Sequence, residues 1–164
     1  AVTGTIRVGD EVIDLDGLGL RDKSWGARHW QAIGWYRWMP LTFTPDFAMV
    51  PSVVAGHPGG MVLVGDEYHP IRECTIETDW DDDQYQTGMR CTVVTDERTY
   101  EVTGEVLSLI PLRHRRTTAD GEVVATRITE AMTRFRCDGH IGIGMSEYLD
   151  PLDPDTGKVL GPLH

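Results

Sequence analysis

The sequence alternates short runs of β-branched and aromatic residues with turn signals, and it shows almost no helical periodicity. Gly9-Asp10, Asp96-Glu97 and Asp138-Gly139 each separate two such runs, and Asp138-Gly139 is the strongest hairpin signal. Consecutive strands with short connections predict one antiparallel sheet, which we expect to close on itself because closure removes its exposed edges. We therefore expect an all-β fold: an antiparallel up-and-down barrel of about 8–10 strands, with little helix and room for one small ligand.

The chain has 164 residues, a length that suits one domain. No internal repeat or low-complexity segment divides it before the last strand. We assign residues 1–150 to the barrel. Residues 151–164 are rich in proline and glycine, and we expect them to form an extended C-terminal tail.

The net charge limits the possible binding partners, and the number of cysteines indicates the cellular compartment. A formal net charge of −11 disfavours nucleic acid and anionic membranes, because both would repel the chain. No apolar run approaches the length of a membrane span. Three cysteines make an odd number, which predicts a reducing compartment and a cytoplasmic location. The six histidines show no metal-ligand spacing, and nucleotide-loop motifs are absent, so we expect no metal and no cofactor.

The hairpin at Asp138-Gly139 places two glutamates side by side. A two-residue turn there sets Met132 opposite Met145 and Glu130 opposite Glu147, with glutamate Cβ atoms about 5 Å apart. The flanking apolar residues predict that this is the inner face of the barrel. Like charges so close cannot both ionise cheaply, so one glutamate is protonated or both pair with arginine. A buried Glu–Arg pair, or a register slip that turns both glutamates outward, remains the structural alternative.

The same reasoning at the acidic hairpin tip of residues 79–84 sets Cys74 opposite Cys91 and Ile76 opposite Met89. The two cysteines are then buried thiols that behave as small hydrophobic residues. A cross-strand disulfide between them is the other possibility.

Residues 17–30 (GLGLRDKSWGARHW) combine two tryptophans with cations and an acid. Large aromatic side chains contribute when buried, and a carboxylate buried beside them needs a partner. One interpretation is an ionic latch, in which Arg21 and Arg28 hold Asp22 and seal the barrel end under Trp25. The other gives Asp22 a proton-transfer role in an apolar cavity.

Two stretches carry a resemblance to a known family. Residues 19–28 (GLRDKSWGAR) and 144–148 (GMSEY) resemble the hydroxyneurosporene synthase (carotenoid 1,2-hydratase)-like, AttH-like lipocalin-type proteins, and the likeness is to the C-terminal half of their two-barrel chains. The resemblance implies a lipocalin-like barrel and the addition of water to an isolated C=C bond of an isoprenoid without a redox cofactor. It also implies a second barrel, supplied by a homo-oligomer or by a missing N-terminal half.

Hydration of an alkene needs an acid that protonates carbon and aromatic faces that shield the resulting cation. We therefore predict a hydratase or lyase of the carbon–oxygen class, acting on a small hydrophobic molecule. The candidate catalytic residues are Asp22, Glu147, Glu130 and Tyr148. The candidate substrate-binding residues are Arg21, Trp25, Arg28, Trp30, Trp35, Tyr36 and Trp38.

Two alternatives use the same cavity. In the first, the protein is a non-catalytic lipocalin-like carrier of an apolar ligand. In the second, it is a cofactor-free isomerase or cyclase. A buried carboxyl group with a raised pKa favours the enzymes, whereas a cavity whose carboxylates are all ion-paired favours the carrier.

Overall fold

The computed structural model describes residues 1–26 and 33–163, which form fourteen β-strands and no helix. The expected all-β antiparallel fold is therefore confirmed. The first strands are β1 (Val2–Val8), β2 (Glu11–Gly17), β3 (Tyr36–Trp38), β4 (Leu41–Thr44), β5 (Phe47–Met49), β6 (Ser52–Val54) and β7 (His57–Gly59). The remaining strands are β8 (Met61–Val64), β9 (Glu67–Pro70), β10 (Glu73–Trp80), β11 (Gln86–Val94), β12 (Thr99–Thr117), β13 (Val123–Cys137) and β14 (His140–Leu152).

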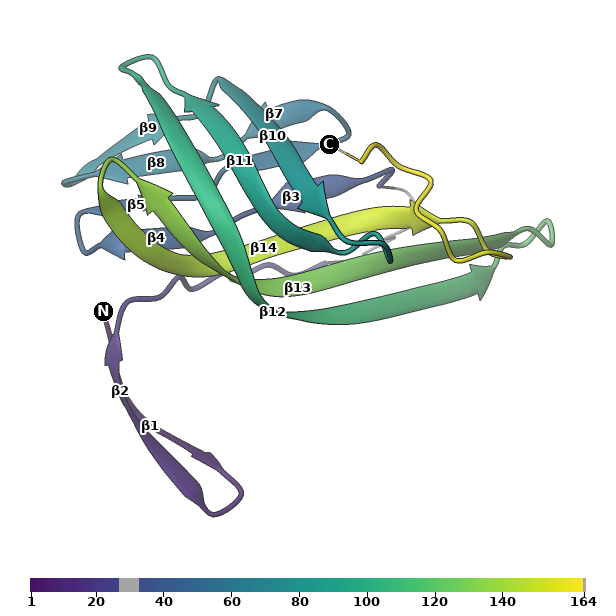
Figure 1. Cartoon of the computed structure of the whole chain (residues 1–164), viewed down its shortest axis with the longest axis horizontal. Coiled ribbons are helices and arrows are strands. Elements are labelled where there is room, and N and C mark those ends of the chain that lie inside the picture. The colour runs from purple at the N-terminus through teal and green to yellow at the C-terminus, as the bar shows by residue number, and fades with distance from the viewer. Residues whose placement is uncertain (27–32, 164) are drawn as a thin grey trace.

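Twelve of the strands form one antiparallel sheet that curls into a half-barrel, consistent with a lipocalin-like barrel (Figure 1). From β10 to β14 each strand pairs with the next in the chain. β14 then pairs with β4 through its first half and with β3 through its second half, so the sheet splits into a β4-β5-β8-β9 branch and a β3-β6-β7 branch. Short strands between residues 36 and 70 raise the number of strands above the expected 8–10.

The hydrophobic core fills the concave side of the half-barrel, which we call the inner face. Alternate residues of β13 point into it, and Phe135 and Cys137 are buried there. On β14 the inward position belongs to Tyr148, which lies in the same core. Glu130 and Met132 therefore lie on the opposite, outer face.

This arrangement corrects the prediction for the glutamate pair. The register is as predicted, because Glu130 lies opposite Glu147 and Met132 opposite Met145. The face is the reverse of the one we expected, since the core packs against the other side of the strands. Both faces of β13 and β14 carry apolar side chains, so the period-two pattern did not distinguish them.

The register of β10 and β11 differs from the prediction by two residues. Cys74 lies opposite Val93, and Ile76 lies opposite Cys91. The pair next to the tip, Trp80 and Gln86, already differs from the prediction by one residue, and a bulge between Asp79 and Trp80 adds the second. The cysteines still share the inner face, as diagonal neighbours with their Sγ atoms 3.6 Å apart. Both are buried free thiols.

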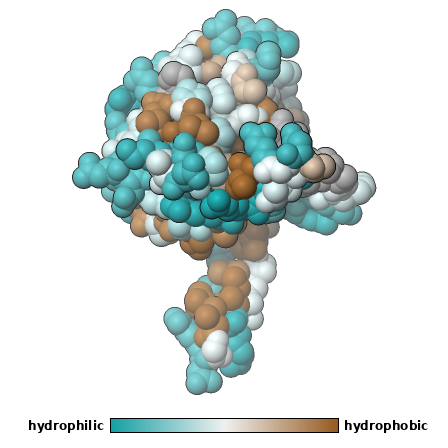
Figure 2. Space-filling model, turned by 90° about the vertical axis from the view of Figure 1, so that its right-hand side faces the viewer, coloured by the Kyte–Doolittle hydropathy of each residue, from teal (hydrophilic) through white to brown (hydrophobic). Residues whose placement is uncertain are grey.

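β1 and β2 form a separate two-stranded sheet, the arm, that projects from the half-barrel (Figures 1 and 2). Ile6 lies opposite Ile13, as the Gly9-Asp10 turn predicts. Apolar side chains of the arm are exposed, and Val8 reaches 61% exposure. Among the described strands, the arm pairs with none of the main sheet, so the predicted barrel of residues 1–150 begins in the structure only at β3.

The C-terminal segment folds back over the half-barrel and does not extend from it (Figure 1). A turn at residues 153–158 returns the chain, and Val159 forms a bridge with Leu152. The carbonyl of Pro162 then accepts a hydrogen bond from the buried Arg37 at 3.2 Å. In the described part of the chain, no helix is long and apolar enough to cross a lipid bilayer.

Candidate functional site: an outer groove and an inner pocket

A groove on the outer face brings together several residues that the sequence predicts as a site. It has a volume of about 510 Å³ and includes Asp22, Trp38 and Glu130. Its apolar walls come from the linker after the arm and from β4, β12, β13 and β14. These further lining residues are Leu18, Gly19, Leu20, Pro40, Thr42, Ser108, Ile110, Met132, Ile143, Gly144 and Met145. We call this site the outer groove.

Glu130 lines the outer groove, and antiparallel pairing of β13 and β14 sets it opposite Glu147 on the same face of the sheet. Both residues are half-buried. Burial, and then the nearby charge of Glu147, raise the pKa of Glu130 above its ordinary value. The hydroxyl of Tyr36 donates a short hydrogen bond to Glu147 Oε1. Glu130 therefore holds its proton more readily than a free glutamate does.

Arg127 and Arg134, the arginines nearest Glu130 in sequence, have other partners. Arg134 lies 3.1 Å from the exposed carboxylate of Glu105, and Arg127 points to the inner face. Over residues 1–26 and 33–163, no salt bridge reaches Glu130 or Glu147. In an apolar groove without a neighbouring cation, the neutral form of a carboxyl group is favoured over the charged form.

In residues 21–26 the structure does not show the predicted seal of the barrel end under Trp25. Trp25 is 81% exposed, and the ammonium group of Lys23 lies 5.3 Å from its ring centroid. Arg21 and Asp22 are also exposed, although Asp22 lines the outer groove. Arg28 and Trp30, the other two candidates in this segment, lie outside the described residues.

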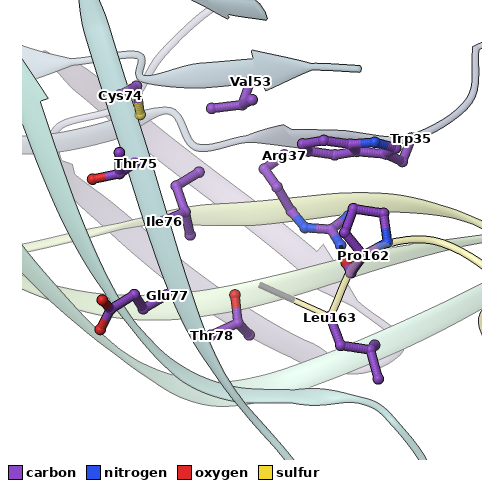
Figure 3. A pocket seen from close by; sticks show the side chains of 10 residues that line it. All are labelled: Trp35, Arg37, Val53, Cys74, Thr75, Ile76, Glu77, Thr78, Pro162 and Leu163. Atoms are coloured by element: carbon purple, nitrogen blue, oxygen red, sulfur yellow. Dashed lines mark hydrogen bonds between the residues drawn. The ribbon is translucent and has the colours of Figure 1, made fainter. Parts of the chain in front are cut away.

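Two of the other predicted residues, Trp35 and Tyr148, lie on the inner face, across the sheet from the glutamates. Trp35 and Tyr36 are adjacent in sequence but point to opposite sides, because side chains alternate along a strand. Trp35 lines a pocket of about 450 Å³ at the mouth of the half-barrel, the inner pocket (Figure 3). Tyr148 is fully buried beneath it, and its hydroxyl lies 3.0 Å from Thr78 Oγ1. Burial raises the pKa of Tyr148 to about 12. Tyr148 therefore cannot orient a substrate at the glutamate pair.

An ion cluster lies beneath the inner pocket, and sequence reasoning did not identify it. Arg37 Nη2 is 2.8 Å from Asp150 Oδ1, and Arg127 Nη2 is 3.6 Å from Asp150 Oδ2. All three side chains are at most 3% exposed. The signal available in the sequence was an arginine placed between aromatic residues in one short strand, Tyr36-Arg37-Trp38.

The acidic segments serve as turns. Asp81 Oδ1 accepts the backbone amides of Asp83 and Tyr85, and Asp153 Oδ1 accepts those of Asp155 and Thr156. Among the residues described, no group of three or more His, Cys, Asp or Glu side chains is arranged to hold a metal ion.

The fold and the two cavities define a half-barrel protein with an acid-lined apolar groove outside and an arginine-based pocket inside. The chain belongs to the family described as a domain of unknown function (DUF7064), whose model matches residues 1–152. This match runs from the arm to the end of β14. The comparisons with curated proteins and with solved structures found no match.

Proposed function

We propose that the protein is a cofactor-independent enzyme that binds a small hydrophobic alkene in the outer groove and performs acid–base chemistry on it. The observation that supports this most is the Glu130–Glu147 pair, which combines an apolar groove, a raised pKa and a hydrogen bond from Tyr36. A carboxylic acid kept neutral by burial is the kind of group that protonates carbon.

Glu130 and Trp38 of the groove, together with Glu147, suffice for a hydration in which every proton transferred is returned. Glu130 transfers its proton to one alkene carbon, and the positive charge develops on the other, where the indole face of Trp38 stabilises it. Water attacks that carbon and loses a proton to Glu147. Transfer of this proton from Glu147 to Glu130 restores the starting state, so that one water is added and nothing is oxidised or reduced.

Loss of a proton from the same cation to Glu147, without attack by water, gives an isomer or a cyclised alkene. The groove is open on its outer side, which supplies water and therefore favours hydration. Tyr36, and not the candidate Tyr148, positions the reacting groups, because Tyr36 is the tyrosine that contacts Glu147.

The expected second barrel would cover the outer groove. Ile110 and Met132 at its rim are 64% and 49% exposed, and apolar residues of the arm are exposed as well. Burial of such surface stabilises an association. We propose this cover, from a second copy or from another part of a longer chain, as a component of the complete site.

The test is turnover of a panel of terpenoid and aromatic alkenes, followed by mass spectrometry for the gain of one water. We expect Glu130→Gln to lower turnover about 100-fold or more, because general acid catalysis contributes about that much. Glu73→Gln, an exposed glutamate of β10, serves as the matched control. Full activity of Glu130→Gln would end the proposal.

A carrier is the second candidate. The ion-paired Asp150 beneath the inner pocket is the observation that favours it. Native mass spectrometry separates the two, since a carrier retains the alkene unchanged after prolonged incubation.

A further inference from the structure

The inner pocket opens at the mouth of the half-barrel, on the opposite side of the sheet from the outer groove. Its walls combine side chains of β10 with Trp35, Val53 and the C-terminal residues (Figure 3). Cys74 and Ile76 of β10 point into it and make most of that wall apolar. Glu77 also lines the pocket, but its carboxylate lies 3.3 Å from the Arg90 guanidinium on the exposed side of β10. A volume of about 450 Å³ suits a small ligand with an apolar body.

The polar group at the base of this pocket is the guanidinium of Arg37. Aromatic rings surround it, since its Cζ atom lies 4.3 Å from the ring centroid of Tyr148 and 5.4 Å from that of Trp35. Nη1 donates to the carbonyls of Tyr36 and Leu149. Packing and hydrogen bonds thus hold the guanidinium in one orientation, as a ligand site requires.

The buried charges beneath the pocket do not balance. Arg37 and Arg127 are both cationic, and Asp150 is the one carboxylate that the described residues place between them. Tyr148 does not compensate, because a phenol whose pKa is raised to about 12 stays neutral at physiological pH. One positive charge therefore remains at the base of an apolar pocket, where an anion interacts more strongly than in water.

The C-terminal segment now occupies the position that an anion would take. The Pro162 carbonyl accepts from Arg37 Nη2 at 3.2 Å, and Leu163 also lines the pocket (Figure 3). A neutral carbonyl is a weaker acceptor for guanidinium than a carboxylate, which forms charge-assisted hydrogen bonds. We propose that the inner pocket binds an amphipathic monocarboxylate, whose carboxylate displaces the Pro162 carbonyl from Arg37 and whose apolar chain lies along Cys74, Ile76 and Val53.

Isothermal titration calorimetry with decanoate and with 1-decanol tests this site in the full chain. The two probes share one chain length and differ in charge. We expect decanoate to bind at least about tenfold more tightly than the alcohol, because the carboxylate gains a charge-assisted bond to Arg37. Equal affinity for both probes, or no binding of decanoate, would overturn the proposal.

Two tryptophan substitutions locate the binding. Ile76→Trp fills the inner pocket and is expected to weaken decanoate binding about tenfold or more, whereas Ile110→Trp on the outer face should change it less than about twofold. The reverse pattern would place decanoate in the outer groove and overturn the proposal. Arg37→Gln should reduce decanoate affinity to that of the alcohol, and Ile76→Trp carries the test if that variant fails to fold. The proposal is independent of alkene turnover, which takes place on the other face.

Discussion

Arg37 and Asp150 form a fully buried ion pair, with 2.8 Å between Nη2 and Oδ1. The strands that carry them lie side by side, since Tyr148 of β14 is paired with Arg37 of β3. The tail adds a further contact, because Pro162 accepts from the same guanidinium. Arg37 thus links β3, β14 and the C-terminal segment.

Removal of Asp150 is expected to be strongly destabilising. Asp150→Ala leaves two buried guanidinium groups without a carboxylate, and loss of one partner of a buried pair costs about 3–5 kcal/mol. Urea denaturation measures this change in the free energy of unfolding. Glu105→Ala, which breaks the exposed pair with Arg134, is the control and should cost less than about 1 kcal/mol. Similar losses in both variants would contradict the buried-pair interpretation.

The glutamate pair predicts a specific dependence of stability on pH. The pKa of Glu130 is raised in the folded protein, so the folded state binds this proton more tightly than the unfolded chain does. Its contribution to stability is fully present below the unfolded pKa and is lost as pH rises through the folded pKa. Urea denaturation between pH 4 and pH 8 should therefore show that the free energy of unfolding falls less with rising pH in Glu130→Gln than in the wild type. Parallel pH profiles would argue against a raised pKa.

Gly144 of β14 packs directly against the backbone at the start of β4. A Cβ atom there would lie 2.2 Å from the carbonyl oxygen of Pro40 and 2.7 Å from Leu41 Cα. Because both obstacles are backbone atoms, Gly144→Ala should lower the free energy of unfolding by about 1–3 kcal/mol or more. Gly34→Ala is the control, since a Cβ atom at Gly34 meets nothing within 4 Å. A Gly144→Ala protein as stable as the control would contradict this close contact between β14 and the backbone of residues 40 and 41.

The arm should be the least protected part of the sheet structure in hydrogen exchange. A two-stranded hairpin with apolar side chains on its surface is marginal by itself in water. We expect amides of residues 2–17 to exchange near the rate of unstructured peptide, while those of β13 are protected. Protection of the arm equal to that of β13, together with a molar mass above the monomer in light scattering, would show that another chain covers it.

Sequence reasoning reached the fold class and several strand registers because these depend on local signals. Asp138-Gly139 fixed the β13–β14 pairing, and Gly9-Asp10 fixed that of β1 with β2. It did not reach the β10–β11 register, because the turn at the acidic tip is not centred on Asp82-Asp83 and a bulge beside it shifts the pairing further, and the sequence carries no clear signal of either. The sequence also did not predict the buried role of Arg37, since its partner Asp150 is more than a hundred residues away in the chain.

The sequence alone determined the antiparallel sheet and the position of Glu130 opposite Glu147, because turn chemistry and the period of two are local properties of the chain. The tertiary structure decided which face is inside. β12, β13 and β14 carry apolar side chains on both faces, and the strands between residues 36 and 64, together with β10 and β11, supply the core on one of them. That packing moved the glutamates to the outer groove and buried Arg37, Arg127 and Asp150, since residues far apart in sequence compete for the same limited interior.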